Sequence, residues 1–259
     1  MSDDSVLYET AGGIATITLN RPENRNSMTP DVMARFRARV AEARTDADLR
    51  CLVITGRGAS FCAGADFKTG AAGDAAFPPD RAFASYAPFL DVLDVEVPTI
   101  AAMNGHAIGG GLGLALVCDL RVASADAKYG ANFARLGFHS GMAISYLLPR
   151  IVGVPNAVDL LFSGRIVAGA EAAELGLVHE AVPAGDVAAA ARRRAETIAA
   201  CAPLAVRLMK QSLYRGLAWD PRTAARLESF AQSATLATED AREGIRALLE
   251  KRTPQFSGR

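Results

Sequence analysis

Two glycine-rich turns carry the residues of this sequence best suited to chemistry. Gly109, Gly110 and Gly111 open an apolar segment in "HAIGGGLGLALVCDL" (106–120), and a second turn, "GASFCAGADF" (58–67), directly follows the apolar run "LVIT". Glycine lets backbone N–H groups approach a ligand closely, so each turn can aim one N–H at a common point. Two such donors would form an oxyanion hole, which stabilises a polarised carbonyl or an enolate. The alternative is that these glycines only permit tight turns between strands and helices.

The sequence lacks the usual signatures of phosphate and metal sites. GxGxxG fails because positions 114 and 116 are leucines, and GxxxxGK[ST] is absent. The cysteines at 51, 62, 118 and 201 form no CxxC pair, and the histidines at 106, 139 and 179 show no ligand spacing, so we predict no metal and reduced thiols. Cys62 would be a nucleophile only if its thiol were activated, and no charged neighbour is visible, so the sequence favours a packing role.

The elements that must position these turns follow a β–α–β order. "GIATITLN" (13–20) alternates like a strand, and the next helix is predicted to start with Thr29 as N-cap and Pro30 as its first residue. "LRCLVITG" (49–56) and "PTIAAMNG" (98–105) are typical of strands buried on both faces, and "LRVASADAKYG" (120–130) is strand-like again. We therefore predict an α/β fold with a parallel sheet covered by helices, and ligands bind such folds in loops after the strands.

From residue 186 the pattern becomes helical with no strand between the helices. This divides the chain into a core, 1–185, and a helical segment, 186–259. The segment has too few neighbours of its own to bury every apolar face, so we expect it to dock on the core or on another subunit. The loop 69–80, rich in Gly, Ala and Pro, is predicted to be mobile.

Composition narrows the classes of partner. The 259 residues are 50% hydrophobic, and 28 Lys and Arg balance 28 Asp and Glu, so nucleic acid is a poor candidate. No uncharged apolar run reaches about 18 residues, so no membrane span is expected. The acidic, polar start lacks the order of a signal peptide, which favours a cytoplasmic protein.

Six pieces of the sequence, in order across nearly the whole chain, carry a resemblance to a known family. They are "RPENRNSMT" (21–29), "LVITGRGASFCAGADF" (52–67), "PTIAAMNGHAIGGGLGLALVCDLRVASADAKYG" (98–130), "LLPRIVG" (147–153), "AAELGLVHEAVP" (172–183) and "EKRTPQF" (250–256). Together they resemble the crotonase superfamily, the enoyl-CoA hydratase/isomerase group. The resemblance implies a spiral of ββα repeats and a C-terminal helical segment that builds homotrimers, commonly paired into hexamers. It also implies an acyl-CoA thioester as ligand, with no cofactor beyond the coenzyme A of the substrate.

The resemblance also implies roles for individual residues. Ala65 and Gly110 supply the two N–H groups of the oxyanion hole. The path of the coenzyme is lined by Arg25, Ser27, Ala63, Asp66, Phe67 and Lys68. Lys251 and Phe256 reach the coenzyme of a neighbouring subunit. For Lys68 and Lys251 a solvated surface lysine is the alternative.

The acids that hydration needs are missing from the positions where the family carries them. Hydration requires an activated water and a proton donor, and the hydratases use two glutamates for this. Their positions are Gly113 and Phe133 here, and a third carboxylate site of some relatives is Gly141. These three residues are then expected to line the acyl site. The sequence predicts an oxyanion hole with doubtful hydratase activity.

A histidine is the candidate replacement for the missing acids. His139 lies six residues after Phe133 and could act as acid or base near neutral pH, with a wall or surface histidine as the alternative. His106 favours a packing role, and Tyr129 and Tyr146 are either hydrogen-bonding groups or core aromatics. Two functions stay open. One is an acyl-CoA enzyme of altered chemistry, such as isomerisation, decarboxylation or thioester cleavage; the other is a non-catalytic acyl-CoA binder or carrier.

Overall fold

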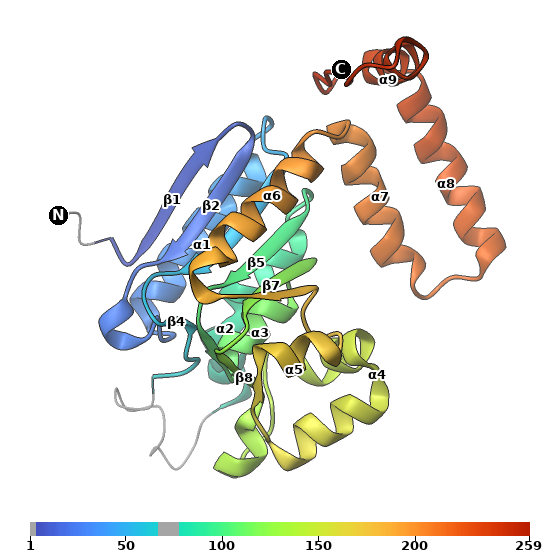
Figure 1. Cartoon of the computed structure of the whole chain (residues 1–259). Helices are drawn as coiled ribbons and strands as arrows, with labels where there is room; N and C mark the ends of the chain where they lie inside the picture. The colour runs from blue at the N-terminus through green and yellow to red at the C-terminus, as the bar shows by residue number, and fades with distance from the viewer. Residues whose placement is uncertain (1–3, 67–77) are drawn as a thin grey trace.

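The computed structural model describes residues 4–66 and 78–259, and within these two sheets organise the core (Figure 1). The larger sheet has the order β1 (Val6–Ala11), β2 (Ile14–Leu19), β3 (Cys51–Gly56), β5 (Thr99–Met103), β7 (Leu120–Ser124) and β10 (Glu180–Val182). The smaller has the order β4 (Ser60–Cys62), β6 (His106–Ile108), β8 (Lys128–Gly130) and β9 (Val167–Ala168). The β1–β2 and β8–β9 pairs are antiparallel and the other pairs are parallel.

Successive strands alternate between the two sheets, and this alternation generates the spiral. β3, β5 and β7 lie in the larger sheet, and the strand that follows each of them, β4, β6 and β8, lies in the smaller one. Each repeat therefore adds one strand to the larger sheet and one to the smaller sheet. The turns that follow β4 and β6 come to lie next to each other, because these two strands are paired in parallel. The predicted α/β fold with a parallel sheet is confirmed, and the alternation is the spiral of ββα repeats that the resemblance implies.

The strand β3 is buried on both faces, as its wholly apolar sequence predicts. Leu52 and Ile54 belong to the main core, which α1 covers, whereas Cys51 and Val53 face the second core. That second core is closed by α6 (Val187–Ala199), which contacts β3, β5 and β7. Small side chains line its buried face, so the helix can lie close to the sheet.

The helix α1 (Pro30–Thr45) begins where the sequence predicts. The Thr29 hydroxyl accepts a hydrogen bond from Val32 N at 3.3 Å, and Pro30 takes the first helical position, where its missing N–H costs nothing. Its buried face consists of Val32, Met33, Phe36, Val40 and Ala43. The helix thus fixes the end of the segment 21–29, which lies beside the site.

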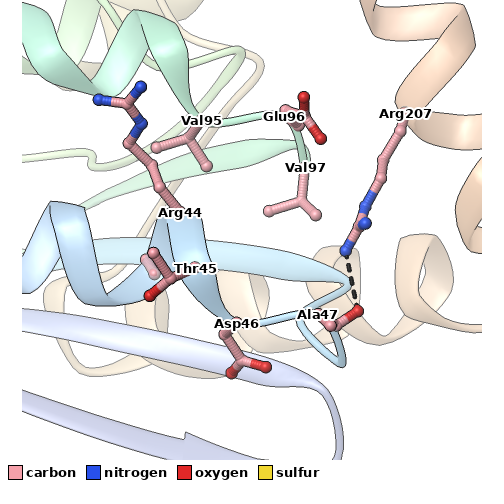
Figure 2. A pocket seen from close by; sticks show the side chains of 9 residues that line it. Arg44, Thr45, Asp46, Ala47, Val95, Glu96, Val97 and Arg207 are labelled. Atoms are coloured by element: carbon pink, nitrogen blue, oxygen red, sulfur yellow. Dashed lines mark hydrogen bonds between the residues drawn. The ribbon is translucent and has the colours of Figure 1, made fainter.

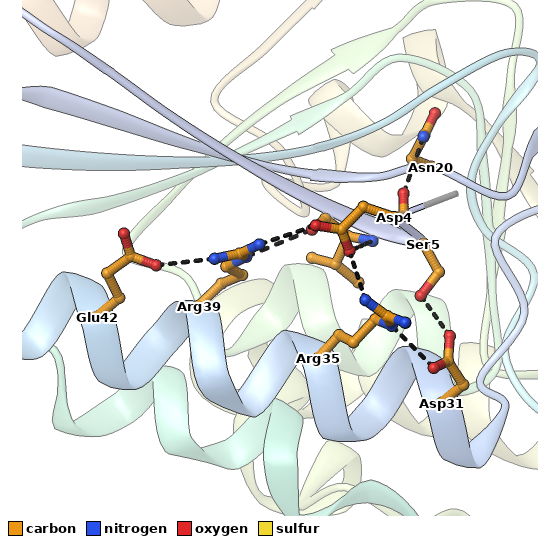
Figure 3. Close-up of polar contacts among 8 residues, drawn as sticks. Asp4, Ser5, Asn20, Asp31, Arg35, Arg39 and Glu42 are labelled. Carbon is orange, nitrogen blue, oxygen red and sulfur yellow. Dashed lines mark hydrogen bonds and ion pairs between the residues drawn. The ribbon is translucent and has the colours of Figure 1, made fainter. Parts of the chain in front are cut away.

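Ion pairs hold the first described residues on α1 (Figure 3). Asp4 accepts from Arg35 at 3.1 Å and from Arg39 at 2.8 Å, and the Ser5 hydroxyl donates to Asp31 at 2.6 Å. These contacts dock the start of β1 against α1.

In the described ranges, four further helices complete the core region, and the sequence patterns predicted only one of them. This one is α3 (Gly110–Leu116), and the others are α2 (Pro79–Leu90), α4 (Ile144–Ser163) and α5 (Gly169–Glu174). Single turns of 3-10 helix stand at Pro22–Asn24, Asp91–Asp94, Asn132–Leu136 and Ala184–Asp186. Residues 69–77 of the loop predicted to be mobile lie outside the described residues, and α2 already starts at Pro79.

The last three helices stand away from the sheets (Figure 1): α7 (Pro203–Gly216), α8 (Pro221–Leu236) and α9 (Glu239–Glu250). The run 221–252 forms two helices, because the Thr238 hydroxyl caps a new helix by accepting from Ala241 N. The division at residue 186 stays a prediction; α6 itself packs on the larger sheet. No helix in the described ranges is long and apolar enough to cross a bilayer.

A half-buried ion pair joins α7 to the end of the glycine-rich segment. Lys210 Nζ lies 2.7 Å from Asp119 Oδ2 and 2.9 Å from the Val97 carbonyl oxygen. The same carboxylate accepts from Thr99 N at 2.7 Å and from the Tyr214 hydroxyl at 2.6 Å. The side chains of Lys210 and Asp119 are only 12% and 17% exposed, so solvent compensates poorly if one partner is lost.

We expect Lys210→Met to lower the free energy of unfolding by about 1–3 kcal/mol, because Asp119 keeps its charge but loses its cationic donor. Urea denaturation followed by circular dichroism measures the change. Arg192→Met is the matched control, since Arg192 pairs with Glu196 on the exposed side of α6 and such pairs contribute little. Equal losses in both variants would contradict a special role for the Lys210–Asp119 pair.

Candidate functional site

The two glycine turns meet where β4 and β6 pair in the smaller sheet. Gly64, in the first turn, has a φ of +80°, and an ideal Cβ built on it would lie 2.7 Å from the Ile108 carbonyl oxygen and 3.0 Å from Gly110 N. Only glycine tolerates both that backbone conformation and that approach. Because Ala65 N is bonded to the carbonyl carbon of Gly64, the backbone N–H groups of Ala65 and Gly110 come to the same place.

These two N–H groups have no protein acceptor in residues 4–66 and 78–259. Gly110 is the first residue of α3, so its N–H lies before the first intrahelical hydrogen bond, which runs from Gly113 N to Gly109 O at 3.1 Å. Gly109 N in turn donates to Gly130 O at 2.8 Å, which fixes the turn on β8. Two fixed, unpaired donors suit an oxygen that gains negative charge. The catalytic role of Ala65 and Gly110 stays a prediction.

A segment before α1 runs along the first turn and brings four predicted coenzyme-path residues together. The Arg25 carbonyl oxygen accepts from Ala63 N at 3.0 Å, and Asn24 Nδ2 donates to Asp66 Oδ2 at 3.2 Å. The Ser27 hydroxyl is buried and donates to the Asn24 carbonyl oxygen at 2.7 Å, so it shapes the segment. The Arg25 side chain is exposed and free to contact a ligand.

The residue that holds this segment is Asn26, which the sequence patterns missed. Its side chain is fully buried, and Nδ2 donates to the carbonyl oxygens of Ser60 at 2.7 Å and Arg57 at 3.1 Å. Its Oδ1 accepts from Arg21 N at 2.9 Å. Asn26 and Arg25 both have left-handed backbones, a conformation that asparagine tolerates better than most residues. That preference is the signal by which the sequence could have identified it.

The space beside Gly113 is filled by a methionine. An ideal Cβ on Gly113 would lie 2.8–2.9 Å from three atoms of Met142, a residue that is 2% exposed. The Phe133 ring reaches the oxyanion turn, 3.6 Å from an ideal Cβ on Gly109, and packs edge-to-face on Phe138 at 5.5 Å between ring centroids. The structure therefore places apolar groups at both positions where the hydratases are expected to carry glutamates.

The third acid position and the candidate histidine lie at the adjoining turn. An ideal Cβ on Gly141 would lie 3.0 Å from Cε1 of Tyr86, an aromatic residue of α2 that the sequence patterns did not single out. His139 is exposed, and its Nδ1 lies 2.6 Å from the Ser140 carbonyl oxygen. His139 is thus on the segment that leads to Met142, and its proposed role as acid or base stays a prediction.

Cys62 and His106 both have structural surroundings. Burial raises the pKa of the Cys62 thiol to about 12, so the thiol stays protonated near neutral pH and is a poor nucleophile. His106 Nδ1 accepts from Lys128 N at 2.9 Å and so joins β6 to β8. The buried Cys62 agrees with the packing role that the sequence favours, whereas His106 is exposed and has a hydrogen-bonding role in the sheet.

The two other tyrosines considered have different surroundings. Tyr129 is fully buried, and its hydroxyl lies 3.0 Å from the Ser124 carbonyl oxygen and 3.2 Å from that of Met103. Tyr146 is exposed on α4, where the Arg150 guanidinium lies 3.4 Å from the ring centroid. Tyr129 is therefore a core aromatic with a satisfied hydroxyl, and Tyr146 belongs to the surface.

Of the remaining predicted ligand residues, the two that the structure describes, Lys251 and Phe256, lie away from the turns within this chain. Phe67 and Lys68 lie outside the described residues. Lys251 is exposed just after α9, and the Phe256 ring packs on that helix, 3.5 Å from an ideal Cβ on Gly244. Figure 1 shows α9 at the upper right, beyond α7 and α8 and away from β4 and α3. Their expected contact with a neighbouring subunit's coenzyme stays a prediction.

A cavity of about 230 Å³ lies elsewhere, between the end of α1, the start of β5 and α7 (Figure 2). Arg207 crosses it and donates to the Ala47 carbonyl oxygen at 3.1 Å. Its lining includes none of the predicted site residues, so we assign it to the contact between α7 and the core. In the ranges that the structure describes, no three histidine, cysteine or carboxylate side chains gather as a metal site would require.

Comparison with known proteins gives one consistent result. The sequence profile described as Enoyl-CoA hydratase/isomerase matches residues 9–259. The (E)-benzylidenesuccinyl-CoA hydratase of Thauera aromatica is 36% identical over 98% of this chain and 99% of its own. The short-chain-enoyl-CoA hydratase of Clostridium acetobutylicum is 33% identical over 97% of each chain. The crystal structure of enoyl-CoA hydratase from Bacillus anthracis superposes with a TM-score of 0.92 at 32% identity, over 98% of this chain and 100% of that one.

Proposed function

Because the chain belongs to the enoyl-CoA hydratase/isomerase family, we propose that it binds an acyl-CoA thioester and holds the thioester carbonyl oxygen between the N–H groups of Ala65 and Gly110. The observation that carries this proposal is the meeting of the two turns at Gly64 with both N–H groups unpaired in the described residues. The exposed Arg25 side chain lies on the adjoining segment, where a cation suits the phosphates of the coenzyme.

The chemistry that this arrangement supports is enolate formation. When a proton leaves the α-carbon of an acyl thioester, negative charge moves to the carbonyl oxygen, and two preorganised N–H donors stabilise it there. In our proposal the enzyme is a lyase or isomerase in which this stabilisation dominates. His139 or the substrate itself handles the proton, because Gly113, Phe133 and Gly141 offer no carboxylate.

A second candidate is a non-catalytic acyl-CoA binder or carrier, and one observation favours it. Met142 is buried against Gly113, so the space beside the first turn of α3 holds a thioether, which neither donates nor removes a proton. A hole of N–H donors serves plain binding as well as catalysis. The two candidates differ in whether the bound acyl group reacts, and for the proposed enolate chemistry the reaction is exchange of its α-proton.

We also propose that the chain assembles as a homotrimer, or as a hexamer of two trimers, through its helical segment. Large apolar side chains lie exposed on α7–α9, including Leu213, Leu217, Phe230, Leu248 and Leu249. Apolar surface of this extent marks an interaction site. The cytoplasmic location of the protein stays a prediction.

The experiment that tests the function combines binding with α-proton exchange. We expect butyryl-CoA to bind at micromolar concentrations by calorimetry. Deuterium uptake at its α-carbon in D₂O, followed by NMR, is expected for the enzyme and absent for the binder. If His139 is the acid or base, His139→Ala slows the uptake without weakening binding, whereas unchanged uptake assigns the proton transfer elsewhere. Failure of butyryl-CoA to bind would overturn the proposal.

A further inference from the structure

Two methionine side chains lie on the first turn of α3, directly beside one of the two N–H donors. An ideal Cβ on Gly110 would collide with the Met28 Sδ and lie 3.2 Å from the Met142 Sδ. The two thioethers therefore flank the same Cα, whose N–H is unpaired in the described part of the chain. We refer to Met28 and Met142 as the thioether pair.

Each member of the thioether pair is fixed by its backbone. Met28 forms a parallel bridge with Ala65, and its N–H donates to Gly64 O at 2.8 Å, so it moves with the first turn. Met142 and Ala143 both have left-handed φ angles, 57° and 54°, immediately before α4. Such a conformation costs about 1 kcal/mol or more in each non-glycine residue and persists only where the surroundings impose it.

The helix α4 holds this turn in place. Ile144 N donates to the Gly141 carbonyl oxygen at 3.1 Å, and Leu147 N donates to the Ala143 carbonyl oxygen at 2.9 Å. Met142 is 2% exposed, so its side chain is committed to the space beside Gly113 and Gly110. The flexible side chain of Met142 is thus attached to a backbone that α4 holds rigidly.

We propose that the thioether pair, and Met142 above all, determines which acyl groups the site accepts, favouring straight apolar chains over chains branched next to the carbonyl. The inference rests on the proposed function, because a carbonyl oxygen held by Gly110 N–H places the α- and β-carbons of the acyl group within a few ångströms of these sulfurs. A thioether offers dispersion contacts and only a weak acceptor, so it suits methylene groups. The extra methyl of a branched chain meets Met142, which is already packed against Gly113.

The test compares butyryl-CoA with isobutyryl-CoA, which have the same atoms and differ in branching at the α-carbon. In the wild-type protein we expect calorimetry to show butyryl-CoA binding about tenfold or more tightly, the discrimination typical of one misplaced methyl group. Met142→Ala is expected to bring the two dissociation constants within about threefold, because it opens the space that the branch needs. Leu93→Ala, which truncates an exposed apolar side chain of the 3-10 helix Asp91–Asp94, outside the proposed assembly surface, is the control and is expected to keep the wild-type ratio.

Thermal unfolding supplies a second measurement that is independent of ligand. Gly113→Ala is expected to lower the Tm, because its Cβ would collide with Met142. The loss is expected to be smaller when Gly113→Ala is made in a Met142→Ala background, because alanine removes the Sδ and Cε of Met142 and keeps only its Cβ. A ratio unchanged by Met142→Ala, in protein that still binds butyryl-CoA, would overturn the inference and leave the proposed function standing. Wild-type protein that binds neither thioester would overturn the proposed function itself.

Discussion

Replacing Gly110 by proline is expected to slow α-proton exchange of butyryl-CoA by about 10²–10³-fold relative to Gly110→Ala, which is the usual effect of losing one oxyanion donor. Proline suits the first position of a helix, where its fixed φ is favourable and the N–H is already outside the helical ladder. The substitution therefore removes the donor and leaves α3 able to form. If the protein is a pure binder, the same comparison is expected to appear as weaker affinity.

Gly110→Ala is the matched control for this experiment. Both variants carry the Cβ that collides with Met28, and that collision involves the far end of a flexible side chain, which can move aside. They differ in the N–H and in the ring that replaces it. Equal exchange rates and equal affinities in the two folded variants would contradict the assignment of Gly110 N–H to the oxyanion hole. Circular dichroism and the Tm establish that both are folded.

Local signals in the sequence were sufficient for two of the elements that lie beside the site, α1 and β3. Thr29 and Pro30 encode the start of α1 within three residues, and the apolar run of β3 encodes burial on both faces. Both signals depend on the residues themselves and their nearest neighbours. The order of the repeats followed from them, and the spiral from the family resemblance.

Contacts between distant segments were beyond such signals. Met142 is nearly thirty positions from Gly113, and nothing near either residue indicates that the thioether fills the space left by the glycine. The three-residue strand β6 is too short to show alternation, and α4 contains Pro149 and Pro155, which argue against a helix. Two helical pieces meet there at Gly153, whose φ of 76° and ψ of 158° are non-helical and form the kink between them.

The same geometry explains why the sequence could locate the missing acids without showing what replaced them. The sequence shows that Gly113 and Phe133 stand at the two positions where the family carries glutamates. The structure shows what occupies the space instead. The Phe133 ring lies near Gly109 and the Met142 thioether beside Gly113, so apolar groups form a wall around the turn. This wall is the physical basis of the last prediction.

The protein is expected to hydrate crotonyl-CoA at least about 10⁴-fold more slowly than the short-chain-enoyl-CoA hydratase of Clostridium acetobutylicum assayed beside it, because each positioned acid or base is worth about 10²–10⁴ in rate and two are absent. The loss of enoyl-thioester absorbance measures hydration. Comparable rates in the two proteins would contradict our interpretation of Gly113 and Phe133. Restoring one acid, Gly113→Glu, is not expected to help while Met142 occupies the space next to its Cβ.

Shortening that methionine makes the restored acid testable. We expect Gly113→Glu/Met142→Ala to hydrate crotonyl-CoA faster than Gly113→Gln/Met142→Ala, which has the same shape but cannot act as acid or base. The rate of this double variant should stay below that of the Clostridium acetobutylicum enzyme, since Phe133 still occupies the position of the second acid. Gly113→Glu alone, with Met142 in place, should match its own glutamine counterpart. A gain in the single variant equal to that in the double variant would show that Met142 does not block this position.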